Sequence, residues 1–158
     1  MIKSLDRYEK IILGLTIIGL ILGAGAIVLS VVEAGIHLPT KEGRIDPTAV
    51  RQTAPFDAPG VYDNGDGTYE AVIVAQTWLW EPDTIEVPAG SEVEFLITSI
   101  DVLHGFHVWD TALNAMVIPG QITRVTQQFD TAGEYGIVCH EYCGIGHHQM
   151  FGRVVVTP

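Results

Sequence analysis

A short stretch near the C-terminus gathers side chains that bind soft metal ions. It contains both cysteines of the chain, Cys139 and Cys143, followed by His147 and Met150 in the spacing C-x3-C-x3-H-x2-M. Thiolates, imidazoles and a thioether favour copper over Mg²⁺ or Ca²⁺. A Cys2His2 zinc site is a rival, but this spacing differs from the usual zinc modules and leaves Met150 without a role. The pattern predicts a copper site.

The two thiols admit three arrangements. A disulfide between Cys139 and Cys143 suits an oxidising compartment but leaves His147 and Met150 unexplained. A blue-copper site uses two histidines, one cysteine and a weak axial methionine, and it leaves one thiol free. Two thiolates that each bridge two copper ions use every ligand, and sharing one electron between the ions keeps bond changes small. Since no open position for a substrate is needed, this arrangement predicts an electron relay.

A site of this kind needs a second histidine from elsewhere in the chain. The segment Asp101-Val102-Leu103-His104-Gly105-Phe106-His107 supplies two candidates, His104 and His107. Spacing alone does not choose between these two, nor between His147 and His148, because each histidine is equally suited to a structural or surface role.

Short β-branched and aromatic runs separated by turns surround these motifs, and no long helix is evident among them. The runs predict an all-β sandwich or barrel with the metal cluster held between the last two strands. We assign residues 61–158 to this domain and the Pro- and Gly-containing residues 34–60 to a linker. The expected strands cover residues 69–75, 84–87, 92–98, 105–109, 122–129, 134–139 and 152–157.

The N-terminal part, residues 1–33, contains an uncharged apolar run from Ile11 to Val32. At ~1.5 Å per residue it spans about 33 Å, enough for one transmembrane helix and longer than the core of a signal peptide. Lys3, Arg7 and Lys10 precede it, which favours a cytoplasmic N-terminus and an outer soluble domain. Small residues at Gly19, Gly23, Ala26 and Ser30 form one helix face that suits a membrane partner.

Charge excludes one class of partner. The chain has 19 acidic and 8 basic residues and a formal net charge of -11, whereas a nucleic-acid-binding protein carries a basic surface. The acidic excess of the outer domain is suited to steering a basic partner protein, although solubility alone also explains it.

Three motifs together resemble subunit II of cytochrome c oxidase, in the haem-copper oxidase superfamily. They are Asp101-Val102-Leu103-His104, Ile118-Pro119-Gly120 and Cys139-x-Glu141-x-Cys143-Gly144-x-x-His147-x-x-Met150. The resemblance implies a cupredoxin-like Greek-key β-barrel on one N-terminal transmembrane helix, as in the single-helix B-type oxidases. It also implies a dinuclear CuA centre that passes electrons from cytochrome c to haem in subunit I, where oxygen is reduced with proton translocation. The expected location is a prokaryotic plasma membrane, with the copper domain on the periplasmic side.

The resemblance also implies roles for individual residues. The copper ligands would be His104, Cys139, Cys143, His147, Met150 and the backbone carbonyl of Glu141. The Glu141 side chain resembles the A-type oxidases, where it helps bind Mg²⁺ at the interface with subunit I; acting through its carbonyl alone is the other interpretation.

Three further residues have expected roles near the copper. Asp101 resembles a residue that orients His104. Trp78 and Trp80 are candidates for the point where electrons enter, and their alternate spacing predicts that both lie on one face of a strand. Such aromatic pairs are also common in protein cores. A membrane-tethered copper carrier without an oxidase remains an alternative function, and it would not require the small-residue helix face.

Overall fold

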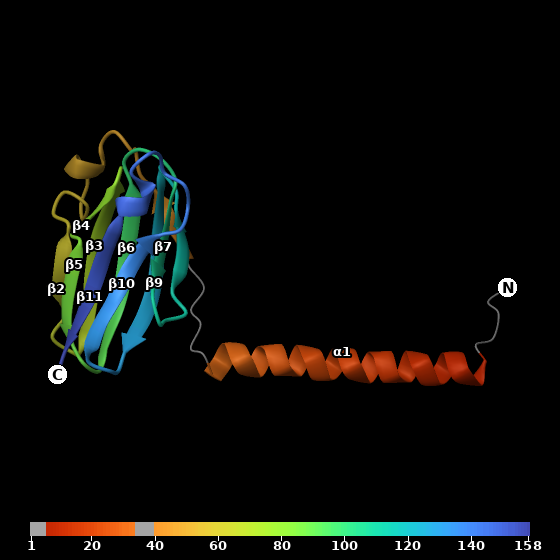
Figure 1. Cartoon of the computed structure of the whole chain (residues 1–158). Helices are drawn as coiled ribbons and strands as arrows, with labels where there is room; N and C mark the ends of the chain where they lie inside the picture. Colours follow the sequence, from red (N-terminus) through yellow and green to blue (C-terminus); the bar gives the residue numbers. More distant parts are fainter. Residues whose placement is uncertain (1–5, 34–39) are drawn as a thin grey trace. The chain divides into compact units, whose positions relative to one another are not determined.

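The computed structural model describes residues 6–33 and 40–158 and divides the chain into two compact units, residues 1–36 and 37–158 (Figure 1). Among the described residues, the first unit consists of the helix α1 (Arg7–Glu33). The second unit consists of eleven strands and two 3₁₀ helices in the described part of the chain.

Helix α1 begins at a reciprocal cap. The Glu9 backbone N–H donates to Asp6 Oδ1 at 2.8 Å, and the Asp6 N–H donates to Glu9 Oε2 at 2.9 Å, as in a capping box. The 27 residues span about 40 Å at ~1.5 Å each, and the predicted apolar run lies inside them. Of the helices in the described residues, α1 alone is long and apolar enough to cross a membrane.

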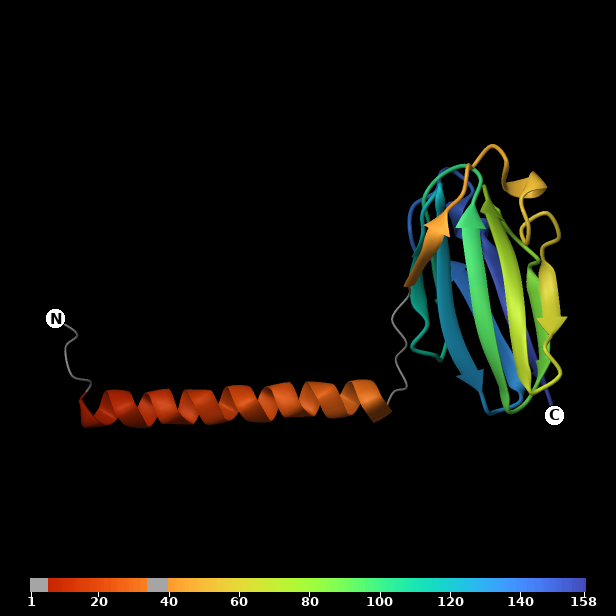
Figure 2. The same ribbon diagram turned by 180° about the vertical axis from the view of Figure 1, so that it is seen from behind.

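The strands of the second unit form two sheets that face each other (Figures 1 and 2). The first sheet has the order β1-β9-β6-β3-β2, with β4 paired to β3, and the second has the order β5-β11-β10-β7-β8. The 3₁₀ helices η1 (Val50–Gln52) and η2 (His147–Gln149) lie in connections. The strands are β1 (Thr40–Arg44), β2 (Gly60–Asp63), β3 (Thr68–Gln76), β4 (Leu79–Glu81), β5 (Thr84–Pro88), β6 (Ser91–Ser99), β7 (His104–Val108), β8 (Asn114–Val117), β9 (Gln121–Phe129), β10 (Gly133–Cys139) and β11 (Phe151–Thr157).

The order of the strands confirms the predicted Greek-key, all-β architecture. The connections from β4 to β5, from β5 to β6, from β6 to β7, from β8 to β9 and from β9 to β10 each cross between the sheets. Strands β3 and β6 pair in parallel, as do β5 and β11, so neither pair is a simple hairpin. Each sheet therefore combines strands from distant parts of the sequence.

All seven predicted strands coincide with strands of the structure, β3, β5, β6, β7, β9, β10 and β11. Four further strands, β1, β2, β4 and β8, are absent from the prediction. They have three to five residues each, too few to show a hydrophobic period. Each of them pairs with one of the predicted strands: β1 with β9, β2 and β4 with β3, and β8 with β7. Their formation depends on the sheet edges that the longer strands provide.

Part of the segment predicted as a linker, residues 34–60, packs against the β domain. Val50 and Phe56 are fully buried, and they pack with Val72 and Val74 of β3 in a second apolar cluster. Strand β3 is therefore buried on both faces, since Ala71, Ile73 and Ala75 belong to the main core instead. The segment lacks a regular period because it covers a sheet face as an irregular strap. Residues 34–39 lie outside the described residues.

Candidate metal centre

The predicted metal ligands meet at one end of the sandwich because of strand pairing. Strand β10 lies between β7 and β11, with Cys139 opposite Phe106 and Val138 opposite Phe151. Strand β10 ends at Cys139 where β7 begins at His104 and β11 begins at Phe151. The β10–β11 connection is thus fixed at both ends beside the start of β7.

The two thiols lie side by side and do not form a disulfide. Both cysteines are free and buried, and their Sγ atoms are 3.8 Å apart, whereas a disulfide bond measures about 2.05 Å. The disulfide interpretation therefore does not describe this structure.

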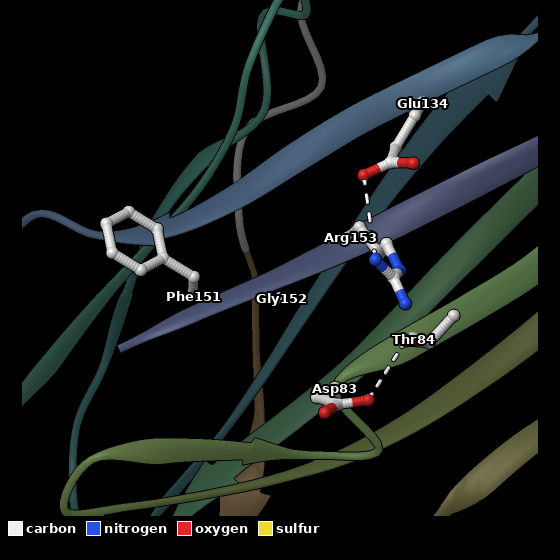
Figure 3. Close-up of a pocket in the computed structure, with 6 residues that line it drawn as sticks. All are labelled: Asp83, Thr84, Glu134, Phe151, Gly152 and Arg153. Atoms are coloured by element: carbon white, nitrogen blue, oxygen red, sulfur yellow. Dashed lines mark hydrogen bonds and ion pairs between the residues drawn. The ribbon is translucent and has the colours of Figure 1, made fainter. Parts of the chain in front are cut away.

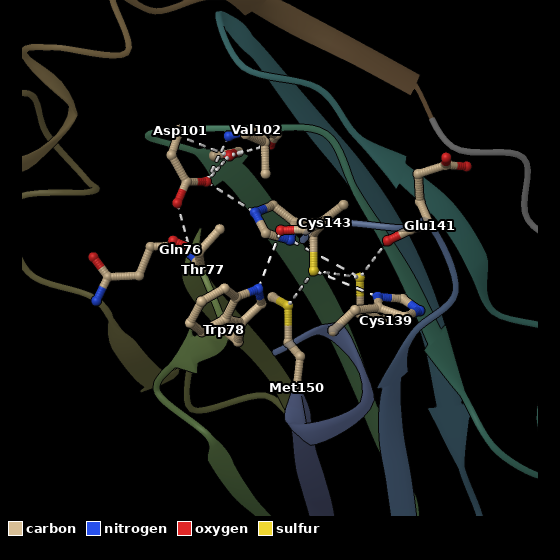
Figure 4. A network of polar contacts seen from close by, with 12 residues as sticks. Gln76, Thr77, Trp78, Asp101, Val102, Cys139, Glu141, Cys143 and Met150 are labelled. Atoms are coloured by element: carbon tan, nitrogen blue, oxygen red, sulfur yellow. Dashed lines mark hydrogen bonds and ion pairs between the residues drawn. The ribbon is translucent and has the colours of Figure 1, made fainter. Parts of the chain in front are cut away.

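Each thiol has its own imidazole. His104 Nδ1 lies 3.9 Å from Cys139 Sγ, and His147 Nδ1 lies 3.4 Å from Cys143 Sγ. Met150 Sδ lies 3.7 Å from Cys143 Sγ (Figure 4). The Glu141 backbone oxygen lies 3.2 Å from Cys139 Sγ. The structure thus brings all six predicted donors together.

These distances fit a soft metal centre. Two donors bound to one tetrahedral ion at about 2.0–2.3 Å are separated by roughly 3.5 Å, close to the distances observed here. Donor atoms of His104, Cys139 and Cys143 all lie within 4.8 Å of one another, and all three residues are buried. Five of the six donors are sulfur or imidazole nitrogen, and each half of the site has a thiol at its centre, a set that suits copper.

The other described histidines of the domain do not face the thiols. His107 Nδ1 lies 2.8 Å from the backbone oxygen of Leu113, whereas His140 and His148 are exposed. Ring orientation therefore distinguishes the candidate histidines that sequence spacing does not, because His104 and His147 are the ones that face the thiols.

Asp101 supports His104 from the side opposite the thiols. Its Oδ1 lies 2.9 Å from His104 Nε2, and its carboxylate also accepts hydrogen bonds from the backbone N–H groups of Thr77 and Val102, both at 2.6 Å. Partial burial raises the pKa of Asp101. The hydrogen bonds from His104 and from these two N–H groups lower the pKa by more, so it lies below its usual range. A carboxylate behind an imidazole fixes the ring and its tautomer, which leaves Nδ1 directed at the metal position.

The two thiols differ in acidity. Burial raises the pKa of Cys139, but hydrogen bonds from His104 and from the Gly105 backbone outweigh burial and lower it to about 7. Burial and then repulsion by Cys139 raise the pKa of Cys143 to about 12. Two adjacent thiolates without a cation are therefore unfavourable, and positive charge between them stabilises both.

The two tryptophans do not share a strand face, so that prediction is wrong. Trp80 lies in β4 and is 1% exposed, with its ring edge-on to His104 at 6.0 Å between centroids. Trp78 lies in the turn before β4, is 38% exposed and covers the outside of the metal-binding loop. The turn between β3 and β4 breaks the alternation. Trp80 is therefore a core residue, and Trp78 alone reaches the surface.

Three contributors to the site were not predicted from the sequence: Thr77, Ser99 and Tyr142. The Thr77 backbone and Ser99 hold Asp101, with Ser99 Oγ at 3.2 Å from its Oδ1. Tyr142 packs its ring against His147 at 5.8 Å between centroids. The position of Tyr142 between Glu141 and Cys143 is a usable signal, whereas the contacts of Thr77 and Ser99 appear only in the folded chain.

A separate open pocket lies outside this centre, between β5, β10 and β11 (Figure 3). Arg153 crosses it and lies 3.8 Å from Glu134, and Asp83 and Thr84 form the opposite wall. Among the residues that the structure describes, the lining offers no thiol or imidazole.

Comparison with known proteins identifies the family. Residues 68–157, more than half of the chain, match the family described as cytochrome C oxidase subunit II, periplasmic domain. This chain belongs to the cytochrome c oxidase subunit II family. It is 40% identical over 158 residues to cytochrome c oxidase subunit 2 of Thermus thermophilus, an alignment covering 98% of this chain and 94% of the relative. The chain is therefore a subunit of a haem-copper oxidase, an oxidoreductase complex.

Solved structures agree with this assignment. A chain from a cryo-EM structure of a haem-copper terminal oxidase dimer is 35% identical, with a TM-score of 0.77 over 95% of this chain and 99% of that one. The periplasmic domain of subunit II of cytochrome oxidase from Bradyrhizobium japonicum is 18% identical and has a TM-score of 0.52, covering 56% of this chain and 83% of that one. The latter shows the shared fold alone, and the predicted cupredoxin-like fold is confirmed.

Proposed function

We propose that this subunit II accepts electrons from cytochrome c at a dinuclear CuA centre and passes them to haem in subunit I, where oxygen is reduced to water with proton translocation. One observation carries the proposal: two free thiols 3.8 Å apart, each with its own imidazole. A single blue-copper site would leave one of these paired thiols without a function.

The residues of the chain are arranged to keep such a centre rigid. When bound, the copper pair supplies a one-electron relay without an open position for substrate. The side chains of His104, Cys143 and Met150 are buried, so their positions are set by packing before any metal is present. Asp101 fixes the His104 ring, and the two strands fix both ends of the loop. Small rearrangement on gaining or losing an electron favours rapid transfer.

The exposed surface around the centre is apolar, which supports docking of cytochrome c there. Tyr142 and Ile145, both in the metal-binding loop, are 74% and 82% exposed, Trp78 packs on the same loop, and Leu79 and Val102 are exposed as well. Trp78 is our candidate for the point where electrons enter, because its ring contacts the loop between two proposed ligands. Apolar contacts rather than charge would then hold the donor in place.

We expect electron transfer from cytochrome c to depend only weakly on ionic strength. Glu81 is paired with Arg51 at 2.5 Å and Asp101 is paired with His104, which reduces the negative charge available to attract a basic donor. Between about 20 and about 200 mM salt, the second-order rate constant should change by less than about 3-fold, whereas steered association changes by 10-fold or more. Stopped-flow oxidation of reduced cytochrome c by the purified oxidase measures this. A steep decline with salt would show that the acidic charge steers the donor.

We propose that α1 anchors the subunit in a prokaryotic plasma membrane beside subunit I, with the N-terminus cytoplasmic and the copper domain periplasmic. The length and apolar composition of α1 support a single membrane crossing, and Arg7 and Lys10 lie at its N-terminal end. The complex would also include further small subunits. In this arrangement residues 1–33 are the membrane part and residues 61–158 contain the whole metal centre.

We propose that Glu141 acts on copper through its backbone carbonyl. The carbonyl oxygen lies at Cys139 Sγ, and in the described residues no cluster of three oxygen-bearing ligands includes the Glu141 carboxylate. An Mg²⁺ ion at this carboxylate would therefore need ligands from subunit I.

Glu141→Gln should leave the copper spectrum unchanged, because the substitution keeps the backbone oxygen. Electron spin resonance of the purified oxidase checks the copper, and growth with Mn²⁺ in place of Mg²⁺ gives a second signal in the same sample. Loss of a bound Mn²⁺ signal in the variant would establish the magnesium role. A changed copper spectrum would contradict the carbonyl assignment.

The proposed function as a whole is tested by purifying the complex after mild solubilisation. We expect haem absorption and a copper signal in which one unpaired electron is shared by two nuclei. Isolation of a copper protein without a haem-containing partner would instead support a membrane-tethered copper carrier.

A further inference from the structure

Trp78 makes a specific hydrogen bond to the metal-binding loop. Its indole Nε1–H donates to the backbone oxygen of Cys143 at 3.1 Å, across 65 residues of sequence. The carbonyl that it holds belongs to the residue whose Sγ lies closest to His147 and Met150. The indole therefore fixes the backbone at the centre of one half of the metal site (Figure 4).

The loop is shaped to receive this ring. A Cβ added at Gly146 would lie 2.3 Å from Trp78 Cδ2 and 2.5 Å from Cε3, distances that real side chains do not adopt. A Cβ at Gly144 would lie 3.3 Å from Nε1, and the φ of +115° at Gly144 also disfavours other residues. The indole thus packs directly on the loop backbone between Cys143 and His147.

The residue before Trp78 holds the other half of the site. The Thr77 N–H donates to Asp101 Oδ2 at 2.6 Å, and Asp101 Oδ1 lies 2.9 Å from His104 Nε2. His104 Nδ1 in turn faces Cys139. Two consecutive residues of the β3–β4 turn therefore reach both halves of the metal site, one through a carboxylate and the other through an indole.

We propose that Thr77 and Trp78 form a positioning bracket that sets the spacing between the His104–Cys139 half and the Cys143–Met150 half. This inference rests on the proposed function, and it gives Trp78 a role that is separate from the entrance of electrons. Partners behind metal ligands fix ligand orientation, and their loss typically costs about 10- to 100-fold in metal affinity. The bracket holds the distance between the two thiols constant. That distance in turn sets the spectrum and the reduction potential of the bound copper.

Trp78→Phe and Gly146→Ala test the bracket in the purified full oxidase. Phenylalanine keeps an exposed ring but removes the N–H bond to Cys143, whereas a methyl group at Gly146 displaces the indole from the loop. For both variants we expect copper to be held about 10-fold less tightly against a Cu(I) chelator. We also expect altered hyperfine splitting in electron spin resonance and a shifted reduction potential.

The chain offers a matched control. Trp109 lies over Gly136 in the same way, since a Cβ there would meet Trp109 Cε3 at 2.7 Å, but it lies in the turn between β7 and β8 and contacts no proposed ligand. Trp109→Phe and Gly136→Ala should leave the copper affinity, spectrum and potential unchanged. Equal changes in the control variants would show that loosening the domain is the cause, and would overturn the bracket.

The measurements separate the bracket from the role of Trp78 in receiving electrons. If Trp78→Phe slows only the reaction with cytochrome c and leaves the copper affinity, spectrum and potential as in the wild type, the bracket is refuted and the electron role stands. If the copper properties change while that reaction keeps its rate, the bracket stands and the electron role is refuted. A wild-type oxidase without a shared-electron signal would contradict the proposed function, and the bracket with it.

Discussion

Replacing Cys143 with serine should abolish the shared-electron copper signal and reduce electron transfer from cytochrome c to haem by at least about 100-fold. The Cys143 Sγ lies within 3.8 Å of three other proposed donors, those of Cys139, His147 and Met150. A serine oxygen is a hard donor that binds Cu(I) poorly, and losing a metal ligand outweighs the 10- to 100-fold effects of residues behind the ligands. The remaining donors could hold at most one copper ion.

Electron spin resonance and stopped-flow absorption of the purified Cys143→Ser oxidase measure both effects. His148→Gln serves as the control, because His148 is exposed in the same loop and has no contact with the thiols. It should leave the spectrum and the rate unchanged. A Cys143→Ser oxidase that kept one electron shared by two nuclei would exclude the thiolate-bridged pair.

Trp80→Ala should lower the free energy of unfolding of the β domain by about 3–5 kcal/mol, the usual cost of removing a buried tryptophan. The side chain is 1% exposed and packs edge-on against Phe106, with centroids 5.2 Å apart, as well as against His104. The cavity would therefore open beside a proposed ligand. This domain has its own apolar core, so residues 40–158 are expected to fold alone.

Urea unfolding of the reduced, metal-free domain, followed by circular dichroism, gives the change in free energy. Trp109→Ala is the matched control, since the same atoms are removed from a side chain that is 50% exposed. Its cost should be about 1 kcal/mol or less. Equal losses for the two variants would contradict the assignment of Trp80 to the core.

Some elements of the fold can be predicted from the sequence and others cannot. Strand β6 was predictable because Val93, Phe95 and Ile97 alternate toward the main core. The strap containing Val50 and Phe56 was not, because its apolar residues follow no period and become buried only on the outer face of β3. Trp78 and Trp80 are a second case in which the local pattern fails to predict burial. Their alternate spacing indicates one strand face, but the turn between β3 and β4 places one outside and one inside.

The apolar helix, the all-β domain and the cluster from Cys139 to Met150 can all be predicted from the sequence, because each depends on residues close together in the chain. That His104 and His147 face the thiols, and that Trp78 packs on the loop at Cys143, becomes known from the folded structure alone. These contacts join residues up to 65 positions apart, as between Trp78 and Cys143. No local pattern encodes such a pair, since its distance is set by strand register and by packing between the sheets.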